Sequence, residues 1–222
     1  VRKEDKTIRE FIIPAQEKLP LDILTISSIK MKWSDKPKDT KINIDLQRGD
    51  HLQIIGPNGI GKSTLLESLA ETFEDNKESN NSNHSIAPDV KVGYYRQDFS
   101  NLDFNKTTYE TLSNALGNSN QQEIRSTASG FLITEEFINT KIGNLSEGQK
   151  GLVAFTELVL MRPGLLILDE PTNHINFRHL PVIANALDKY EGAMIIVSHV
   201  PDFISQIRID KTLDLEKAFS GK

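Results

Sequence analysis

The sequence predicts an α/β fold built on a parallel sheet. Two runs of consecutive apolar residues, Leu165–Leu168 and Met194–Val197, each follow a segment with helical periodicity. Strands that are apolar on both faces belong to sheets covered on both sides by helices, and such sheets are parallel. A third short strand, 52–55, runs into a glycine-rich loop and then into a helix with one apolar face. These three segments decide the fold class.

Two smaller parts are expected around this core. Residues 24–26 and 42–46 alternate, or nearly alternate, between apolar and polar, as half-buried antiparallel strands do. Residues 106–140 are mostly helical in pattern, so we expect a small inserted helical subdomain within roughly residues 100–145. Residues 74–85 contain no apolar side chain and are predicted to form a surface loop.

The two ends of the chain frame this domain. Residues 1–20 are charged and contain two prolines, so we interpret them as an extended arm or as the remnant of a linker. Residues 21–222 are expected to form one domain, with 212–215 as a last edge strand. The first residue is Val1 rather than methionine, which indicates a fragment of a longer protein.

The composition excludes several classes of function. The 222 residues carry a net charge of −5, so no overall positive charge draws the chain to nucleic acid or to anionic lipid. The absence of cysteine excludes disulfides, thiolate metal sites and cysteine catalysis. No apolar run is long enough to span a membrane, and the charged N-terminus lacks the apolar core of a signal peptide.

A phosphate-binding loop follows the strand 52–55. The pattern Gly-x-x-x-x-Gly-Lys-Ser is completed by Lys62 and Ser63. In such loops backbone N–H groups converge on phosphate oxygens, Lys62 supplies a charge at the β- and γ-phosphates, and Ser63 offers a hydroxyl to Mg²⁺. The candidate nucleotide contacts are Gly56, Pro57, Asn58, Gly59, Ile60, Gly61, Lys62, Ser63 and Thr64. The alternative is a glycine-rich turn that binds no nucleotide.

A pair of carboxylates ends the buried strand at 165–168. The carboxyl ends of parallel strands are where ligands bind in α/β sheets. Asp169 is the candidate Mg²⁺ ligand, and Glu170 is the candidate group that orients or activates the attacking water. The alternative is a plain turn or helix start, where carboxylates are also favoured.

The pentapeptide Leu145–Gln149 lies between these two motifs. Ser146 and Gln149 satisfy the capping-box pattern, so an ordinary helix start is one interpretation. Its order and distance relative to Asp169 favour another, in which Ser146, Gln149 and the backbone at Gly148 present a helix N-terminus to a γ-phosphate.

Three single residues complete the candidate site. Gln97 follows a strand and is expected to contact Mg²⁺ and water, although a lone glutamine is usually just a polar surface residue. His199 ends the strand 194–197 at the same sheet edge as Glu170, where it could hydrogen-bond a γ-phosphate. Trp33 is the only tryptophan and is expected to stack on adenine, with core or interface packing as the alternative.

Together these motifs carry a family resemblance. Gly56–Thr64, Gln97, Leu145–Gln149, Leu165–Glu170 and His199 resemble, in this order, the nucleotide-binding loop, glutamine loop, signature, acidic strand and histidine switch of ATP-binding-cassette (ABC) ATPases. The resemblance implies an ATPase with ATP and Mg²⁺ as cofactors and with Glu170, His199 and Lys62 as catalytic residues. It also implies a sandwich, in which each ATP lies between one domain's phosphate loop and the other domain's signature.

The run Pro171–His174 narrows the resemblance to the ABC-F class, whose members are soluble and carry two ATPase domains in one chain. Residues 93–98 point the same way. The chain then resembles the C-terminal domain of such a cytoplasmic protein, with residues 1–20 as the end of the inter-domain linker. The implied partner is a second ABC domain, in the same polypeptide or as a homodimer, and the ribosome is a further candidate partner. Hydrolysis by the isolated domain is expected to be weak.

Three positions depart from the family pattern. Glu147 stands where the signature usually has glycine, and a carboxylate close to a γ-phosphate is repulsive unless it points away. Asn176 and Val200 stand where aspartate is common. Two alternatives therefore stay open: the ATPase subunit of a membrane transporter, which shares every core motif, and a nucleotide-dependent scaffold that hydrolyses little.

Overall fold

The computed structural model describes residues 6–31, 38–75, 84–117 and 120–220. A five-stranded sheet forms its centre, with the strand order β5-β6-β7-β3-β8, and all neighbours pair in parallel. The strands are β3 (His51–Ile55), β5 (Val92–Tyr95), β6 (Leu165–Asp169), β7 (Ala193–Val197) and β8 (Lys211–Asp214). The predicted parallel α/β core is confirmed, and the expected edge strand is β8.

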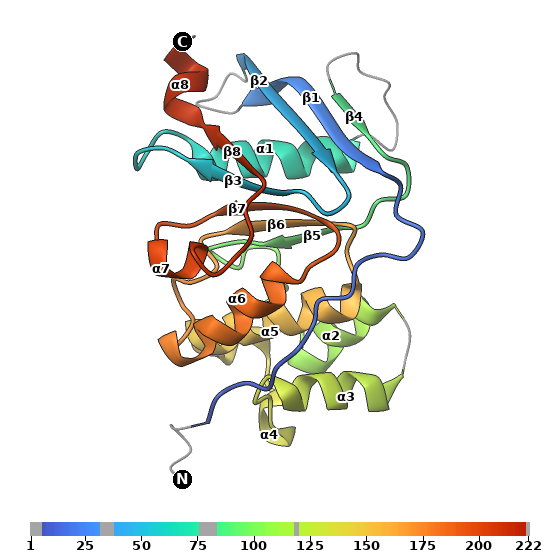
Figure 1. The fold of residues 1–222 in the computed structure, drawn as a ribbon. Helices are drawn as coiled ribbons and strands as arrows, with labels where there is room; N and C mark the ends of the chain where they lie inside the picture. Colours follow the sequence, from blue (N-terminus) through green and yellow to red (C-terminus); the bar gives the residue numbers. More distant parts are fainter. Residues whose placement is uncertain (1–5, 32–37, 76–83, 118–119, 221–222) are drawn as a thin grey trace.

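Both faces of this sheet are covered, as the apolar strands predict (Figure 1). Helix α1 (Lys62–Asp75) packs on one face. Helices α5 (Glu147–Met161) and α6 (Leu180–Asp188) pack on the other. Along β6, Leu165 and Ile167 join the hydrophobic cluster on the α1 side, whereas Leu166 and Leu168 join the cluster on the α5 side. This alternation follows from the two-residue period of a strand.

A second, antiparallel sheet with the order β2-β1-β4 lies beyond α1. It contains β1 (Asp22–Met31), β2 (Lys38–Gln47) and β4 (His84–Ile86). The predicted antiparallel pair is confirmed. The predicted loop at 74–85 is wrong at both ends: residues 74–75 still belong to α1, and Ser85 pairs with Thr25 in β4. A strand can be polar in sequence when its pairing depends on backbone hydrogen bonds.

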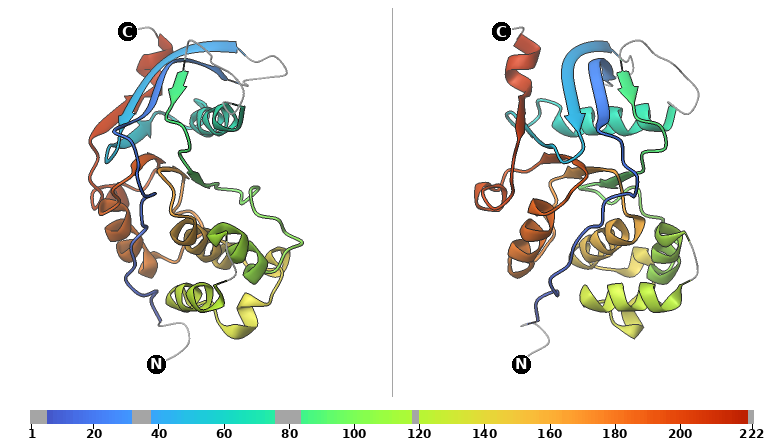
Figure 2. Two further views of the ribbon diagram at one scale, coloured as in Figure 1. Left: turned by 90° about the vertical axis from the view of Figure 1, so that its right-hand side faces the viewer. Right: turned by 45° about the vertical axis from the view of Figure 1, so that its right-hand side comes forward.

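The helical subdomain lies at the opposite end of the molecule (Figure 2). Its helices are α2 (Thr108–Leu116), α3 (Gln121–Gly130), α4 (Glu135–Ile138) and the 3-10 turn η2 (Ile142–Asn144). It contacts the core chiefly through α5. The remaining short elements are η3 (Phe177–His179), α7 (Pro201–Ile204) and α8 (Leu215–Ser220). Among the described residues, no helix combines the length and the apolar character that crossing a membrane requires.

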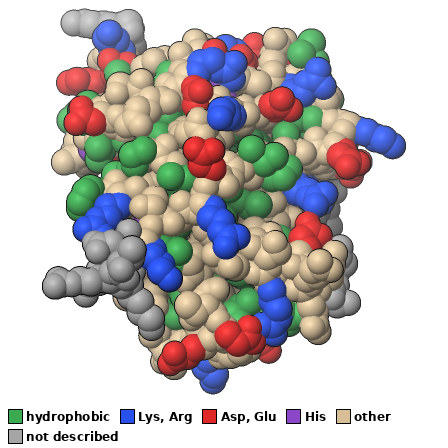
Figure 3. Space-filling model, turned by 60° about the horizontal axis from the view of Figure 1, so that its bottom comes forward, with side chains coloured by type: hydrophobic (Ala, Val, Ile, Leu, Met, Phe, Trp, Pro, Cys, Tyr) green, Lys and Arg blue, Asp and Glu red, His purple; other side chains and the backbone are tan. Residues whose placement is uncertain are grey.

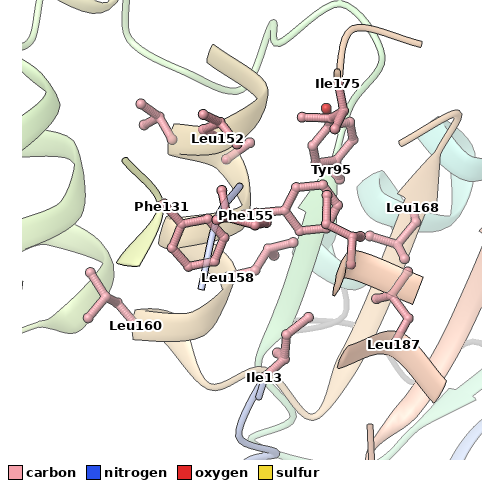
Figure 4. Packing of buried hydrophobic residues seen from close by; sticks show 14 of the residues in the cluster. Ile13, Tyr95, Phe131, Leu152, Phe155, Leu158, Leu160, Leu168, Ile175 and Leu187 are labelled. Atoms are coloured by element: carbon pink, nitrogen blue, oxygen red, sulfur yellow. The ribbon is translucent and has the colours of Figure 1, made fainter. Parts of the chain in front are cut away.

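The arm preceding β1 is extended, as expected, but it is packed onto the domain (Figure 2). Ile8 and Ile13 are 3% and 4% exposed. Ile13 belongs to the same hydrophobic cluster as Phe155 and Leu187 (Figure 4). The backbone N–H of Arg9 donates to the carbonyl of Gly130 at 2.9 Å. Nearby, the ring centroids of Phe11 and Phe131 lie 4.6 Å apart. The arm is therefore a structural part of this fold and joins the helical subdomain to the core.

Candidate functional site

The loop between β3 and α1 folds as a phosphate cradle. Gly56, Gly59 and Gly61 have φ values of 150°, 78° and 99°, which side chains rarely tolerate. A Cβ on Gly56 would also approach the side chain of Ile60 to 3.0 Å. The loop leads directly into α1, so the unpaired N–H groups of the helix start point toward the same space. The loop therefore requires glycine at these positions for reasons of backbone conformation.

Lys62 lies at the centre of this cradle. It is 8% exposed, and its Nζ donates to the carbonyls of Gly56 at 2.8 Å and Pro57 at 3.1 Å. A cavity of about 480 Å³ opens above it. The cavity is lined by Asn58, Gly59, Gly61, Lys62, Ser63, Thr64, Gln97, Glu170, Asn173, Val197 and His199. Most of the predicted phosphate contacts thus share one space with Glu170 and His199.

Asp169 ends β6 beside the phosphate loop. Its Oδ1 is buried and has no hydrogen-bond partner among the described residues. Burial raises the pKa of Asp169 to about 6, a hydrogen bond from Ser63 opposes that shift, and the nearby charge of Glu170 adds to it. Asp169, Ser63 and Gln97 line a neighbouring cavity of about 310 Å³. The three residues predicted to meet Mg²⁺ are therefore brought together.

Glu170 is held at the same sheet edge by backbone contacts. Its φ is 47°, and its N–H donates to the carbonyl of Val197 at 2.9 Å. Its Oε2 accepts a hydrogen bond from the backbone N–H of His199 at 3.1 Å. The Nε2 of His199 lies 3.3 Å from Glu170 Oε1 but out of line for a hydrogen bond. One carboxylate oxygen is thus anchored by the backbone, and the other is buried without a hydrogen-bond partner among the described residues.

The pentapeptide opens α5, and Ser146 is its N-cap. The Ser146 hydroxyl accepts from the N–H of Gln149 at 3.3 Å, and Gln149 Oε1 accepts from the N–H of Ser146 at 2.9 Å. The predicted capping box is therefore present. Ser146, Gly148 and Gln149 line a different cavity of about 390 Å³, together with Leu152, Asn173, His174, Ile175, Asn176 and His179. None of these residues lines the phosphate-loop cavity except Asn173, which lines both.

A family model described as ABC transporter matches residues 40–173. This span covers the phosphate loop, the pentapeptide and both carboxylates in the order found here. This chain belongs to the ABC transporter family of ATPase domains. ABC ATPase domains bind and hydrolyse ATP.

Relatives of this ABC domain include members of the F class. ATP-binding protein YdiF of Bacillus subtilis is 33% identical over 84% of this chain and 28% of its own length. ABC transporter F family member 5 of Arabidopsis thaliana is 31% identical over 87% of this chain and 28% of its own length. The chain thus spans less than a third of these two relatives.

Solved ABC structures share the fold. A bacterial Atm1-family ABC exporter with ATP bound gives a TM-score of 0.70 at 19% identity, over 91% of this chain and 38% of the exporter chain. The archaeal ribosome recycling factor aABCE1, in complex with a ribosomal stalk protein, gives a TM-score of 0.63 at 21% identity, over 96% of this chain and 42% of that chain.

The donor set of this ABC domain fits Mg²⁺. Among the described residues, no cluster of three or more His, Cys, Asp or Glu could hold a metal alone. Magnesium is commonly bound by one or two carboxylates together with substrate phosphates and water. The unpartnered Oδ1 of Asp169, beside the Ser63 hydroxyl and at the edge of the phosphate cradle, matches that requirement.

The structure differs from the sequence-based expectations at some positions and leaves one of them untested. Trp33, predicted to stack on adenine, lies outside the described residues. Gly56, Pro57 and Ile60 shape the loop without lining its cavity. Asn173 was not predicted as a site residue, yet it lines both the phosphate-loop cavity and the signature cavity. Its place four residues after Asp169, the last residue of β6, was the available signal.

Proposed function

We propose that this chain is one half of an ABC sandwich that binds Mg-ATP and hydrolyses it together with a second ABC domain. The observation that carries this proposal is the separation of the two cavities. Lys62, Ser63 and Glu170 line one, and Ser146 and Gly148 line the other. A signature that does not line the cavity of its own phosphate loop is placed to serve nucleotide held by another domain.

The candidate catalytic and metal-binding residues at the phosphate loop each have a task in this proposal. Lys62 and the loop N–H groups bind the β- and γ-phosphates. Ser63 and Asp169, with Gln97 nearby, would hold Mg²⁺, which neutralises phosphate charge when it is bound. Glu170 Oε1, which has no hydrogen-bond partner among the described residues, orients and activates the attacking water. The His199 imidazole, 49% exposed beside it, donates to the γ-phosphate.

Two substitutions in the full-length protein test the roles of the two cavities one at a time. Lys62→Ala should remove one ATP from the binding stoichiometry measured by calorimetric titration. Ser146→Arg should leave the stoichiometry unchanged but lower phosphate release, because the bulky charge blocks only the partner's nucleotide. If Ser146→Arg released phosphate at the wild-type rate, the sandwich would be excluded.

We further propose that the machine acts on the ribosome, in the cytoplasm. The support is the kinship with F-class proteins and the likeness in fold to a ribosome recycling factor. Such binding cannot rest on overall charge, which is −5. On the face drawn in Figure 3, basic and acidic side chains are interspersed. A ribosome contact would therefore depend on shape and on local pairs of charges.

Sedimentation tests the ribosomal role. Full-length Glu170→Gln protein, which should hold ATP without hydrolysing it, is centrifuged with ribosomes in the presence and absence of ATP. We expect it to pellet with ribosomes when ATP is present. No association in either state, or stable co-purification with a membrane subunit, would count against this role and favour a transporter subunit.

A further inference from the structure

Glu147 departs from the signature pattern, and its carboxylate pairs with a neighbouring lysine. The side chain is about half exposed, and its Oε1 lies 2.8 Å from the Nζ of Lys150, one helical turn further along α5. The carboxylate therefore points along the helix, toward its C-terminal end, to a cation. Glu147 is also the first residue of α5, where the helix dipole favours a negative charge.

Lys150 is the more demanding member of this pair. It is only 8% exposed and lies in the first turn of α5, where the helix dipole disfavours a positive charge. A buried ammonium group is costly unless it is paired. Two groups compensate it here: the carboxylate of Glu147, and the ring of Phe104, whose centroid is 4.7 Å from Nζ.

Phe104 ties this pair to a second segment of the domain. It lies between Gln97 and the helical subdomain, and its carbonyl accepts a hydrogen bond from Gly143 at 3.0 Å. A Cβ on Gly143 would approach the same carbonyl to 3.0 Å, so the segments around Phe104 and Gly143 are in close contact. The stretch that leads into Ser146 and the first turn of α5 is thus fastened to the loop after Gln97 from two sides.

We propose that Glu147 and Lys150 are positioning residues for the partner's nucleotide. As a neutral pair seated on Phe104, they fix the first turn of α5 and with it the phosphate-facing groups of Ser146 and Gly148. This inference rests on the proposed function, since only a second ABC domain supplies the nucleotide concerned. Under this proposal the Glu147 side chain promotes hydrolysis at the partner's nucleotide, whereas a carboxylate that repelled the γ-phosphate would slow it.

Whether Glu147 promotes or slows hydrolysis can be measured in the full-length protein with three variants: Glu147→Gln, Lys150→Met and the double variant. Glu147→Gln leaves Lys150 buried without its partner, so kcat should fall about fivefold, which corresponds to about 1 kcal/mol. KM for ATP should stay within about twofold, because the partner's phosphate loop makes most of the contacts that bind ATP before hydrolysis. Lys150→Met should also lower kcat, because it leaves a carboxylate unpaired near the γ-phosphate.

The double variant is the decisive arm. With both charges removed, kcat should recover to within about twofold of wild type. The reason is that two uncharged side chains then replace an ion pair whose net charge is zero, and no charge is left unpaired. Glu123→Gln is the matched control, because it breaks another 2.8 Å ion pair, with Arg162, away from the signature cavity. It should leave kcat unchanged.

A rise in kcat for Glu147→Gln, or a double variant as slow as the slower single variant, would overturn the proposal. If the wild-type protein turned over no ATP, the proposed function would fail, and the pair would be judged by urea unfolding alone. There Glu147→Gln should lower the midpoint and the double variant should restore it; no recovery would overturn the pairing itself.

Discussion

Glu170 is hydrogen-bonded to His199 through the backbone N–H of the histidine. Its Oε2 accepts from the His199 N–H at 3.1 Å, whereas the imidazole Nε2 stands 3.3 Å from Oε1 without forming a hydrogen bond. The backbone hydrogen bond to Glu170 therefore does not require the histidine side chain. A substitution of His199 that keeps this bond allows the two candidate catalytic groups to be tested one at a time.

The first prediction concerns His199. His199→Ala keeps the backbone bond to Glu170 and removes only the imidazole, so ATP binding should be unchanged. The kcat of the full-length protein should fall by about 10²–10³, as when a single transition-state hydrogen bond is lost. Steady-state phosphate release and calorimetric ATP titration measure the two effects. A loss of ATP affinity with kcat intact would assign His199 to binding instead.

The second prediction concerns pH and Asp169. Burial raises the pKa of Asp169 in the folded, nucleotide-free domain to about 6, compared with an ordinary value of 3.8. Because the folded pKa is the higher one, the ionised carboxylate destabilises the fold. This penalty is absent below about pH 4, grows between about pH 4 and 6, and is complete above that.

Asp169→Asn should therefore stabilise the nucleotide-free chain by about 1–3 kcal/mol at pH 7, and by much less at pH 4. Urea unfolding at the two pH values measures the difference. The same variant should lose Mg²⁺-dependent ATP binding, which is the usual exchange of stability for function at a site. An equal effect at both pH values would show that ionisation of Asp169 is not the cause.

The third prediction concerns the arm and uses two neighbouring isoleucines. Ile13 is 4% exposed within the hydrophobic cluster, whereas Ile12 is 65% exposed. Ile13→Ala should lower the free energy of unfolding by about 2–4 kcal/mol. Ile12→Ala should change it by less than about 0.5 kcal/mol. Equal effects in urea unfolding would mean that the arm does not pack on the domain in solution.

The fourth prediction compares two capping boxes. Ser146 caps α5 and Thr107 caps α2 with the same reciprocal hydrogen bonds, but only Ser146 lines the signature cavity. Each change to alanine should cost about 1 kcal/mol of stability. Only Ser146→Ala should also lower phosphate release by the full-length protein. If Thr107→Ala slowed hydrolysis equally, the effect of Ser146 would be one of helix stability alone.

The sequence predicted the fold where chemistry is local. The glycines of the phosphate loop, the apolar strand before Asp169 and the Ser146–Gln149 capping box each carry their signal within a few residues. The packing of the arm could not be predicted in this way. Ile8 and Ile13 have neither helical nor strand periodicity, because each reaches the cluster from an irregular backbone whose course depends on distant partners such as Gly130.

The electrostatic setting of the site also depended on contacts between distant segments. Glu147 and Lys150 have the spacing of a helical ion pair, which the sequence does contain. What makes the pair consequential is the burial of Lys150 against Phe104, which comes from another segment. Likewise, the separation of Ser146 from Lys62 into two cavities appears only in three dimensions.

The most direct test of the account is single-turnover hydrolysis by the full-length protein with Glu170→Gln. We expect ATP to bind with wild-type stoichiometry, while the rate of γ-phosphate cleavage at this domain's phosphate loop falls by at least about 10², because the group that activates water is gone. Cleavage at the wild-type rate would contradict it and would show that Glu170 does not carry the hydrolysis.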